Sequence, residues 1–451
     1  MVHTEINNAN LDSASRLTAL EAWESQRKKN GETIQARDEV NNHIHTIYSF
    51  SPYTPAMAAL QARDSGLCAA GSVDHDSIAA ADEMSAACAI LGIGGCTGFE
   101  LRVSFKNGAD GGHFARRKIN NPDSEGYAYM TVQGVPAQAV SAAGEFLAPI
   151  RQRRLERTKN MVIAANAALR ESCLKEIHFE RDIIAASKYA EGGGITERHL
   201  LAALARKFIA QYGNGPEIVS GLKTNLGITP NDKIAALLSD AGNPHYLYDL
   251  LGVLKSEFLP RIFIQPDGLE CIPADRVTAF AESIGAIPAY AYLGDVGESP
   301  TGDKKTEKFE DDYIEELFEE LSRLHYRAVT YMPPRNTVEQ LRRVQQLCTE
   351  WGFMEISGVD INSSRQSFNC PEILRDEFRH LTDTTWALIA HEQLSSLNTR
   401  FGLFSPDNPL AGAALQQRIA VYARVGRELD LFHPEESAAE IAHKISKGDM
   451  V

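Results

Sequence analysis

Short apolar segments alternate with polar, helix-forming stretches from about residue 40 to residue 135, and the same pattern returns from about residue 284 onward. Apolar runs of this length, bounded by turn residues, are typical of buried strands. Their alternation with helical stretches predicts an α/β protein with a parallel sheet or barrel. The predicted strands are 42–48, 68–73, 92–103, 127–135, 284–292, 327–331, 354–359 and 386–390.

Between these two regions the pattern is helical, and no strand is expected before about residue 261. The simplest explanation is a helical insertion, joined to the main domain by loops around Pro149 and 266–273. Residues 12–40 are charged and predict a helix that packs on the outside. The expected domains are an N-terminal helical extension (1–38), a discontinuous barrel (39–148 and 276–451) and a helical insertion (149–275).

The composition limits the class of protein. The chain has 451 residues, of which 43% are hydrophobic, and no apolar run approaches the roughly 20 residues of a membrane span. The N-terminal residues lack the features of a secretory signal, so we expect a cytoplasmic protein with no membrane partner. Seven scattered cysteines without a C-x-x-C pair indicate buried thiols rather than a disulfide framework.

The net charge of −15 argues against long nucleic acid as a partner, because such binding needs clustered Lys and Arg. A small phosphorylated substrate in a metal site is compatible with this charge. The arginines of one predicted helix are expected to form a solvated face; they are Arg151, Arg153, Arg154 and Arg157.

Two polar motifs stand at the carboxyl ends of early predicted strands, the face where parallel barrels carry active sites. In His43-Ile44-His45 the two imidazoles project to one side and can converge on a cation. In Asp74-His75-Asp76 the carboxylates could orient the imidazole. Taken singly, the first could be a structural pair, and the second could be a helix N-cap at Asp76.

Two more polar residues occupy the same kind of position. Glu100, on a very apolar strand, needs a partner such as a metal or Arg102. His391 follows the apolar segment 386–390, where a lone histidine is more often a core residue. Because all four groups are expected at one end of the barrel, together they predict a shared metal site.

The segments HIHTIYS, SVDHDS and GFEL resemble, in this order, the first three motifs of the PHP (polymerase and histidinol phosphatase) domain. AYLG at 291–294 and IAHE at 389–392 resemble its later motifs, and the resemblance covers about 40–145 and 280–400. It implies an irregular seven-stranded (β/α) barrel that binds zinc, manganese or iron and hydrolyses phosphoesters. It places His43, His45, Glu100 and His391 on metal ligands, and His75 on the histidine of the second motif.

The chain departs from the family's pattern at several ligand positions. Phe50 stands where the family has an acidic or histidine ligand, Tyr292 where it has a histidine, and Ile389 where it has an aspartate. The histidine of the fourth strand is not found. Asp295 and His113 could substitute, so we expect one divalent metal (Zn, Mn or Fe), with a second as an open alternative.

Phosphate recognition near a metal needs cationic donors, and Arg365, after a predicted strand, is the leading candidate. His75 or Asp74 would handle the proton. Asp360 could support a ligand or simply begin a turn.

The polar loop 297–311 would form a flap near the site. The residues expected to contact the substrate are Tyr292, Asp295, Lys304 and Arg116, although each arginine or lysine could instead be a solvated surface charge.

These expectations describe a metal-dependent hydrolase that acts on a small phosphomonoester of the nucleotide or sugar phosphate type. An alternative is a degenerate PHP domain whose structural or regulatory metal serves ligand or partner binding, which the replaced ligands favour. A third reading is hydrolysis at carbon, as in amidohydrolase barrels, but the carboxylated lysine or late aspartate it expects is not evident. The sequence leaves the substrate, the native metal and the oligomeric state open.

Overall fold

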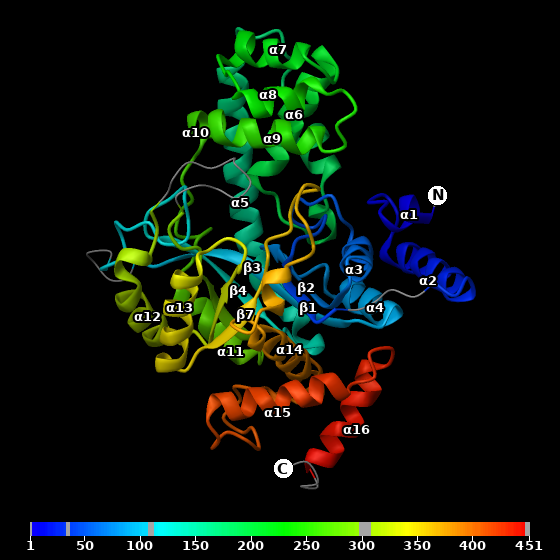
Figure 1. Ribbon diagram of the computed structural model, residues 1–451. Helices are drawn as coiled ribbons and strands as arrows, with labels where there is room; N and C mark the ends of the chain where they lie inside the picture. The colour runs from blue at the N-terminus through cyan, green and yellow to red at the C-terminus, as the bar shows by residue number, and fades with distance from the viewer. Residues whose placement is uncertain (1, 33–36, 107–111, 297–307, 447–451) are drawn as a thin grey trace.

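A seven-stranded sheet curls into a nearly closed barrel at the centre of the molecule (Figure 1). The computed structural model describes residues 2–32, 37–106, 112–296 and 308–446. The strands lie side by side in chain order, and neighbours are parallel except at β4, which is antiparallel to β3 and β5. They are β1 (Glu39–Ile44), β2 (Leu67–His75), β3 (Gly94–Ser104), β4 (Tyr127–Gln133), β5 (Ile287–Ala291), β6 (Ala328–Tyr331) and β7 (Met354–Ser357).

One seam of the barrel, between β7 and β1, is not closed by strand pairing. An isolated parallel bridge between Ile44 and Ile361 spans it. The Ile361 N–H donates to the carbonyl of His43 at 3.1 Å, and the His45 N–H donates to the carbonyl of Ile361 at 2.9 Å. The backbone of both histidines is therefore fixed from β2 on one side and from the seam on the other.

The barrel expected from the PHP resemblance is confirmed, and seven of the predicted strands are found near their predicted positions. The expectation of parallel pairing is wrong at β4. The described residues between β3 and β4 form no helix, and antiparallel neighbours can be joined without a crossover. As a result β4 ends at the bottom of the barrel, opposite the carboxyl ends of the other strands.

The predicted strand at 386–390 is wrong, because these residues lie inside the helix α14 (His380–Leu397). α14 lies below the barrel and packs against β7, β3 and two C-terminal helices (Figure 1). All five residues of the segment are buried, so this part of the helix shows no polar face. A helix segment buried all round cannot be distinguished from a buried strand by periodicity.

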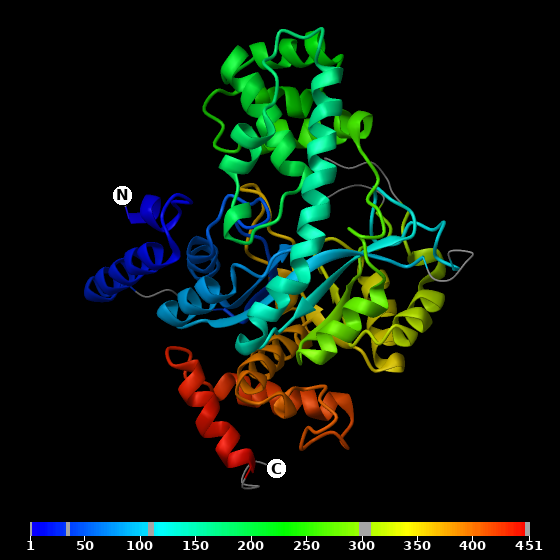
Figure 2. The ribbon, with the colours of Figure 1, turned by 180° about the vertical axis from the view of Figure 1, so that it is seen from behind.

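Helices cover the outside of the barrel, and α14, α15 and α16 form a layer beneath it (Figures 1 and 2). On the outside, α2 is tied to α4 by a buried ion pair between Arg16 and Glu83. The helices at the N-terminus are α1 (Val2–Ile6) and α2 (Ser13–Lys29). The others around and beneath the barrel are α3 (Pro55–Asp64), α4 (Ala81–Leu91), α11 (Ala274–Ser283), α12 (Ile314–Arg323), α13 (Val338–Trp351), α15 (Leu415–Glu428) and α16 (Pro434–Ser446).

The long helix α5 (Val140–Ala168) starts below the sheet and carries the chain upward to a group of helices above the barrel mouth (Figure 2). Its 29 residues span roughly 44 Å. Leu147 packs in the barrel core, whereas Met161 packs in a second apolar core. The helices around this second core are α6 (Glu197–Tyr212), α7 (Glu217–Leu226), α8 (Asp232–Ser239), α9 (Tyr246–Glu257) and α10 (Leu259–Ile262).

Pro149 was expected in a connecting loop, and this is wrong, because it lies within α5. A proline inside a helix removes one backbone hydrogen bond. Here the helix is packed on both sides of the proline, through Leu147 and Ile150 into the barrel core and through Met161 into the second core. The predicted domain boundary at 148/149 therefore falls in a continuous helix.

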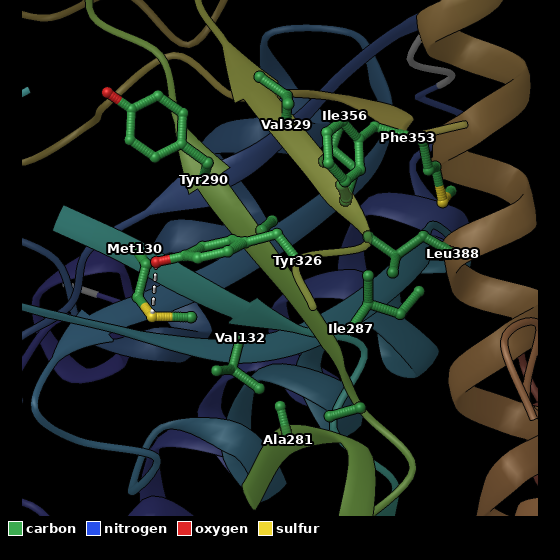
Figure 3. Packing of buried hydrophobic residues seen from close by; sticks show 14 of the residues in the cluster. Met130, Val132, Ala281, Ile287, Tyr290, Tyr326, Val329, Phe353, Ile356 and Leu388 are labelled. Atoms are coloured by element: carbon green, nitrogen blue, oxygen red, sulfur yellow. Dashed lines mark hydrogen bonds between the residues drawn. The ribbon is translucent and has the colours of Figure 1, made fainter. Parts of the chain in front are cut away.

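The barrel core is closely packed where β4, β5 and β6 meet the surrounding helices (Figure 3). Tyr326 is fully buried there, and its hydroxyl donates to the sulfur of Met130 at 3.4 Å. Ile287 and Leu388 meet on the side of α14 (Figure 3). Within the described residues, no helix combines the length and the apolar character needed to cross a bilayer.

Candidate metal centre

Three predicted ligands meet at the mouth of the barrel: His43 on β1, His45 just after it, and Glu100 on β3. His43 Nε2 lies 3.5 Å from Glu100 Oε1, and His45 Nε2 lies 3.8 Å from Glu100 Oε2. One ligand atom from each residue lies within 4.8 Å of the others. Two imidazoles and a carboxylate in this arrangement could hold a divalent metal ion.

Two further side chains border this cluster. His75 ends β2 directly opposite Glu100 in the parallel register, and its Nδ1 lies 2.7 Å from Glu100 Oε2. Asp360 follows β7, and its Oδ1 lies 3.4 Å from His45 Nε2. Asp360 also accepts a hydrogen bond from the Asn362 side chain at 2.6 Å, so it both begins a turn and faces the cluster.

A chain of hydrogen bonds orients the His45 ring. Asp74 is buried at the end of β2 and accepts from the hydroxyl of Ser49 at 2.5 Å. It also accepts from the N–H of Thr46 at 2.6 Å and from the Thr46 hydroxyl at 2.5 Å. Because the Ser49 hydroxyl gives its proton to Asp74, its oxygen accepts from His45 Nδ1, 3.3 Å away. This tautomer leaves the lone pair of Nε2 directed at the cluster.

His45 is suited to bind a metal. Burial, together with the nearby His75 and His43, holds the pKa of His45 well below its ordinary value of 6.5, so the ring is neutral. Within the described part of the chain, its buried Nε2 has no hydrogen-bond partner. A buried imidazole nitrogen without a partner is costly, and a metal ion at the cluster would satisfy it. The residues present therefore fit a divalent metal.

The backbone is strained at two positions beside the cluster. Phe50 has a φ of 90° and Asp76 a φ of 53°, values that residues other than glycine rarely adopt. Asp76 is not a helix N-cap as one reading of the sequence held, because α4 begins at Ala81; it accepts instead from Arg154. Strain of this kind is concentrated at functional sites.

His391, the fourth predicted ligand, is not brought to the cluster. It lies on α14 beneath the barrel, where its Nδ1 accepts from the N–H of Leu403 at 2.9 Å. Its ring packs against Gly134, which follows β4, and burial lowers its pKa to about 4. The expectation of a strand end at the mouth is wrong here, because the segment is helical and lies at the opposite end of the barrel.

Tyr292 and Asp295, two of the predicted substrate contacts, belong to a different network. The Tyr292 hydroxyl donates to Asp311 Oδ1 at 2.6 Å, and Asp295 accepts from the N–H of Phe309 at 2.6 Å. Burial raises the pKa of the neighbouring Glu310 to about 7. These contacts join the residues after β5 to those before α12.

The predicted cations are also engaged elsewhere or lie outside the description. Arg365 pairs with Asp249 on α9, which joins the loop after β7 to the helices above the mouth. His113, the suggested substitute ligand, pairs with Glu316 on α12, and Arg116 is exposed. Lys304 and most of the expected flap lie outside the described residues.

Of the four arginines that the sequence assigned to a solvated face, Arg154 and Arg157 are instead buried in an ion-pair network, whereas Arg151 and Arg153 are partly exposed. Arg154 and Arg157 on α5 both contact Glu197, the first residue of α6. Arg102 was a suggested partner of Glu100, but it pairs with Glu270 and lies 3.4 Å from Glu197. The signal in the sequence was their spacing, because Arg154 and Arg157 continue the helical stripe of Ile150 and Met161, which is buried along α5.

This network borders a cavity of about 60 Å³ beside His75, between the barrel mouth and the helices above it. The barrel contributes His75, Arg102 and Tyr129 to its wall. The remaining lining residues are Asp123, Arg154, Thr196, Glu197, Arg198, Leu201, Lys255 and Leu259. None of these was expected at the site from the sequence, which assigned Arg154 to a solvated face, because they come from a loop and from helices far apart in the chain.

No family model matches the sequence, and no curated protein matches it. Among solved structures, one similar chain is an amidohydrolase from Chromobacterium violaceum, with bound SO4 and no metal. It is 17% identical with a TM-score of 0.46, covering 76% of this chain and 95% of that one. Another, assigned as a metal-dependent phosphoesterase from Bifidobacterium adolescentis, is also 17% identical with a TM-score of 0.46, covering 74% and 90%. Resemblance at this level fixes neither a substrate nor a reaction for this chain.

Proposed function

We propose that this protein is a metal-dependent hydrolase that cleaves a small phosphomonoester. The observation that carries the proposal is the convergence of His43, His45 and Glu100 on one point at the barrel mouth. The ring orientation set by Ser49 and Asp74 supports it, since metal-binding histidines are commonly fixed through their second nitrogen.

His43, His45 and Glu100 would hold the metal, and Asp360 is placed to join them. A divalent metal there supplies Lewis-acid activation of water and charge stabilisation on a phosphoryl oxygen. His75 stands between Glu100 and the cavity, with Nδ1 toward Glu100. Its other ring nitrogen is therefore the one available to exchange a proton with substrate or leaving group.

A binding module with a structural metal is the second candidate function, and the replaced family ligands favour it. Phe50 packs edge-on against His199, with ring centroids 5.0 Å apart, and Tyr292 is bonded to Asp311. Neither position supplies a metal ligand. The two candidates differ in whether the metal site turns over substrate.

Release of phosphate from a panel of phosphomonoesters, with and without Mn²⁺ or Zn²⁺, tests the proposal. We expect metal-dependent release by the wild-type protein and its loss in a His43→Ala/Glu100→Ala double variant. The matched control is His113→Ala/Glu316→Ala, which removes an exposed ion pair between the loop after β3 and α12. Equal turnover by the wild type and the first variant would contradict the proposal. A folded, metal-loaded protein without turnover on any ester would favour the binding module.

A further inference from the structure

The loop after β7, residues 358–366 (the seam loop), lies between the metal centre and the helices above the barrel mouth. On the barrel side, Ile361 exchanges backbone hydrogen bonds with both histidines of the first motif, across the open seam. On the helical side, the guanidinium of Arg365 donates to Asp249 on α9 at 2.6 Å. The seam loop therefore connects the upper helices to the backbone of two metal ligands.

A second contact from the upper helices reaches the carboxylate that faces the metal centre. Arg198, in the first turn of α6, donates to the carbonyl of Asn362 at 2.9 Å. The Asn362 side chain donates to Asp360 Oδ1 at 2.6 Å, and the same oxygen lies 3.4 Å from His45 Nε2. Two hydrogen bonds thus link a side chain of α6 to a carboxylate beside the metal ligands.

The turn that Arg198 contacts is rigid. Gln366 Oε1 accepts from the N–H of Asn362 and from the N–H of Ser363, both at 2.7 Å. The peptide group between Asn362 and Ser363 is planar, and it is bonded at its carbonyl by Arg198 and at its N–H by Gln366. These contacts fix the backbone from which the Asn362 side chain reaches Asp360.

Arg198 is also in contact with the loop after β1. Its guanidinium lies 5.4 Å from the centre of the Phe50 ring, and that ring packs edge-on against His199, the next residue of α6. The ring limits the positions that the long arginine side chain can adopt. Arg198 therefore stands where the loop after β1 and the seam loop meet.

Asp360 is held by hydrogen bonds more than by packing. Its side chain is 40% exposed, whereas those of His45 and Glu100 are 1% and 8% exposed. Ligand atoms about 2.1 Å from a tetrahedral zinc lie roughly 3.4 Å apart. Asp360 Oδ1 has this separation from His45 Nε2. Its place beside the metal site therefore depends on the hold that Arg198 has, through Asn362, on the seam loop.

We propose that Arg198 is a positioning residue, which holds the seam loop so that Asp360 joins the other metal ligands. The proposal rests on the metal centre of the proposed function and adds that the upper helices help to set its metal affinity. Arg198 itself touches the carbonyl of Asn362 and not the metal ligands.

The charge of Arg198 has the opposite effect on a bound cation. After burial and the two neighbouring histidines, this charge also lowers the pKa of His45, so it opposes positive charge at the centre. Loss of the charge alone would strengthen metal binding, whereas loss of the positioning contact would weaken it. The sign of the change in affinity therefore distinguishes the two effects.

Competition with a chelator, carried out on the full-length protein with Zn²⁺ and with Mn²⁺, measures the metal affinity of Arg198→Met. We expect roughly tenfold weaker binding, because loss of an outer hydrogen-bond partner of a metal ligand typically costs about 10- to 100-fold. Arg198→Lys keeps a donor on a long side chain and should recover part of the affinity. Arg206→Met, at an exposed position of the same helix, is the matched control and should bind metal like the wild type.

The same substitution in an Asp360→Asn background shows whether Arg198 acts through Asp360. There Arg198→Met should cause no further weakening, because the carboxylate that it positions is already lost. An equal loss of affinity in both backgrounds would overturn the proposal. Unchanged or tighter metal binding by Arg198→Met in the otherwise wild-type protein would also overturn it.

Hydrogen exchange on metal-free protein distinguishes failure of this proposal from failure of the proposed function. The N–H groups of Asn362 and Ser363 should exchange faster in Arg198→Met than in the wild type or in Arg206→Met. If the wild type binds no metal, the proposed hydrolase is contradicted, while faster exchange would still support the hold of Arg198 on the seam loop. Unchanged exchange would overturn that hold, even in a protein with metal-dependent turnover. Thermal unfolding of each variant confirms that it is folded.

Discussion

The Nδ1 atom of His45 lies 3.3 Å from the hydroxyl oxygen of Ser49, which in turn donates to Asp74. This contact fixes which nitrogen of His45 carries the proton and directs the other toward Glu100. Both histidines of the first motif also sit on backbone that Ile361 holds across the barrel seam. The ligands are thus positioned by the fold before any metal binds.

Replacing Ser49 by alanine should weaken metal binding without unfolding the protein. Loss of the hydroxyl frees the His45 ring to rotate or change tautomer, and loss of such a supporting contact typically costs roughly 10- to 100-fold in metal affinity. Competition with a chelator measures the change. Ser51→Ala is the matched control, because Ser51 is also buried but its hydroxyl has no partner among the described residues. Equal metal affinity in the two variants would show that the Ser49 contact does not position the ligand.

His391→Ala should lower stability and leave the metal content unchanged. The variant leaves the N–H of Leu403 without its acceptor and opens a cavity beneath the barrel, which together cost about 2–4 kcal/mol. Chemical denaturation measures the stability, and elemental analysis measures the metal. If the folded variant lost its metal, His391 would have to be counted among the ligands after all.

Glu392 makes stability depend on pH with a defined sign. Burial raises its pKa to about 8, above its ordinary value of 4.5, so the folded protein keeps a proton that the unfolded chain releases between these values. Stability should therefore fall as pH rises from about 4.5 to 8, with a limiting slope of about 1.4 kcal/mol per pH unit for this group. Glu392→Gln should remove that part of the slope and be the more stable protein at pH 8.

Denaturant unfolding at several pH values measures this difference. Glu310, whose pKa burial raises to about 7, contributes a slope of the same sign in both proteins, so the comparison isolates Glu392. Glu319→Gln, at an exposed position on α12, is the control and should follow the wild type. Parallel pH profiles for wild type and Glu392→Gln would mean that Glu392 is ionised in the folded state.

The barrel strands and the first three motifs could be predicted from the sequence because each depends on local pattern. His43, His45 and Glu100 stand on or just after apolar strands, and parallel pairing of β1, β2 and β3 brings such positions together. In the sequence, His391 has the same kind of position as these three residues, because it follows an apolar run. Such a run is compatible with either a strand or a buried helix. Its neighbour Gly134 comes from a distant part of the chain, and the N–H of Leu403 reaches it only through the turn that follows α14.

The cavity could not be predicted for a related reason. Arg154 and Glu197 are far apart in sequence and meet only because α5 carries the chain past the barrel and the segment before α6 returns it to the mouth. An arginine-rich helix is ordinarily solvated. The local sequence pattern does not show that Glu197 and Glu270 will pair with these arginines in the folded protein. Arg365, which looked better placed, is engaged by Asp249 for the same topological reason.

The central claim is a metal bound by His43, His45 and Glu100. Elemental analysis of protein purified without added metal, wild type beside Glu100→Gln, tests it most directly. The account predicts about one zinc, manganese or iron ion per chain in the wild type and its loss in a folded Glu100→Gln variant. Wild-type protein that contains none of these metals, and binds none on reconstitution, would contradict it.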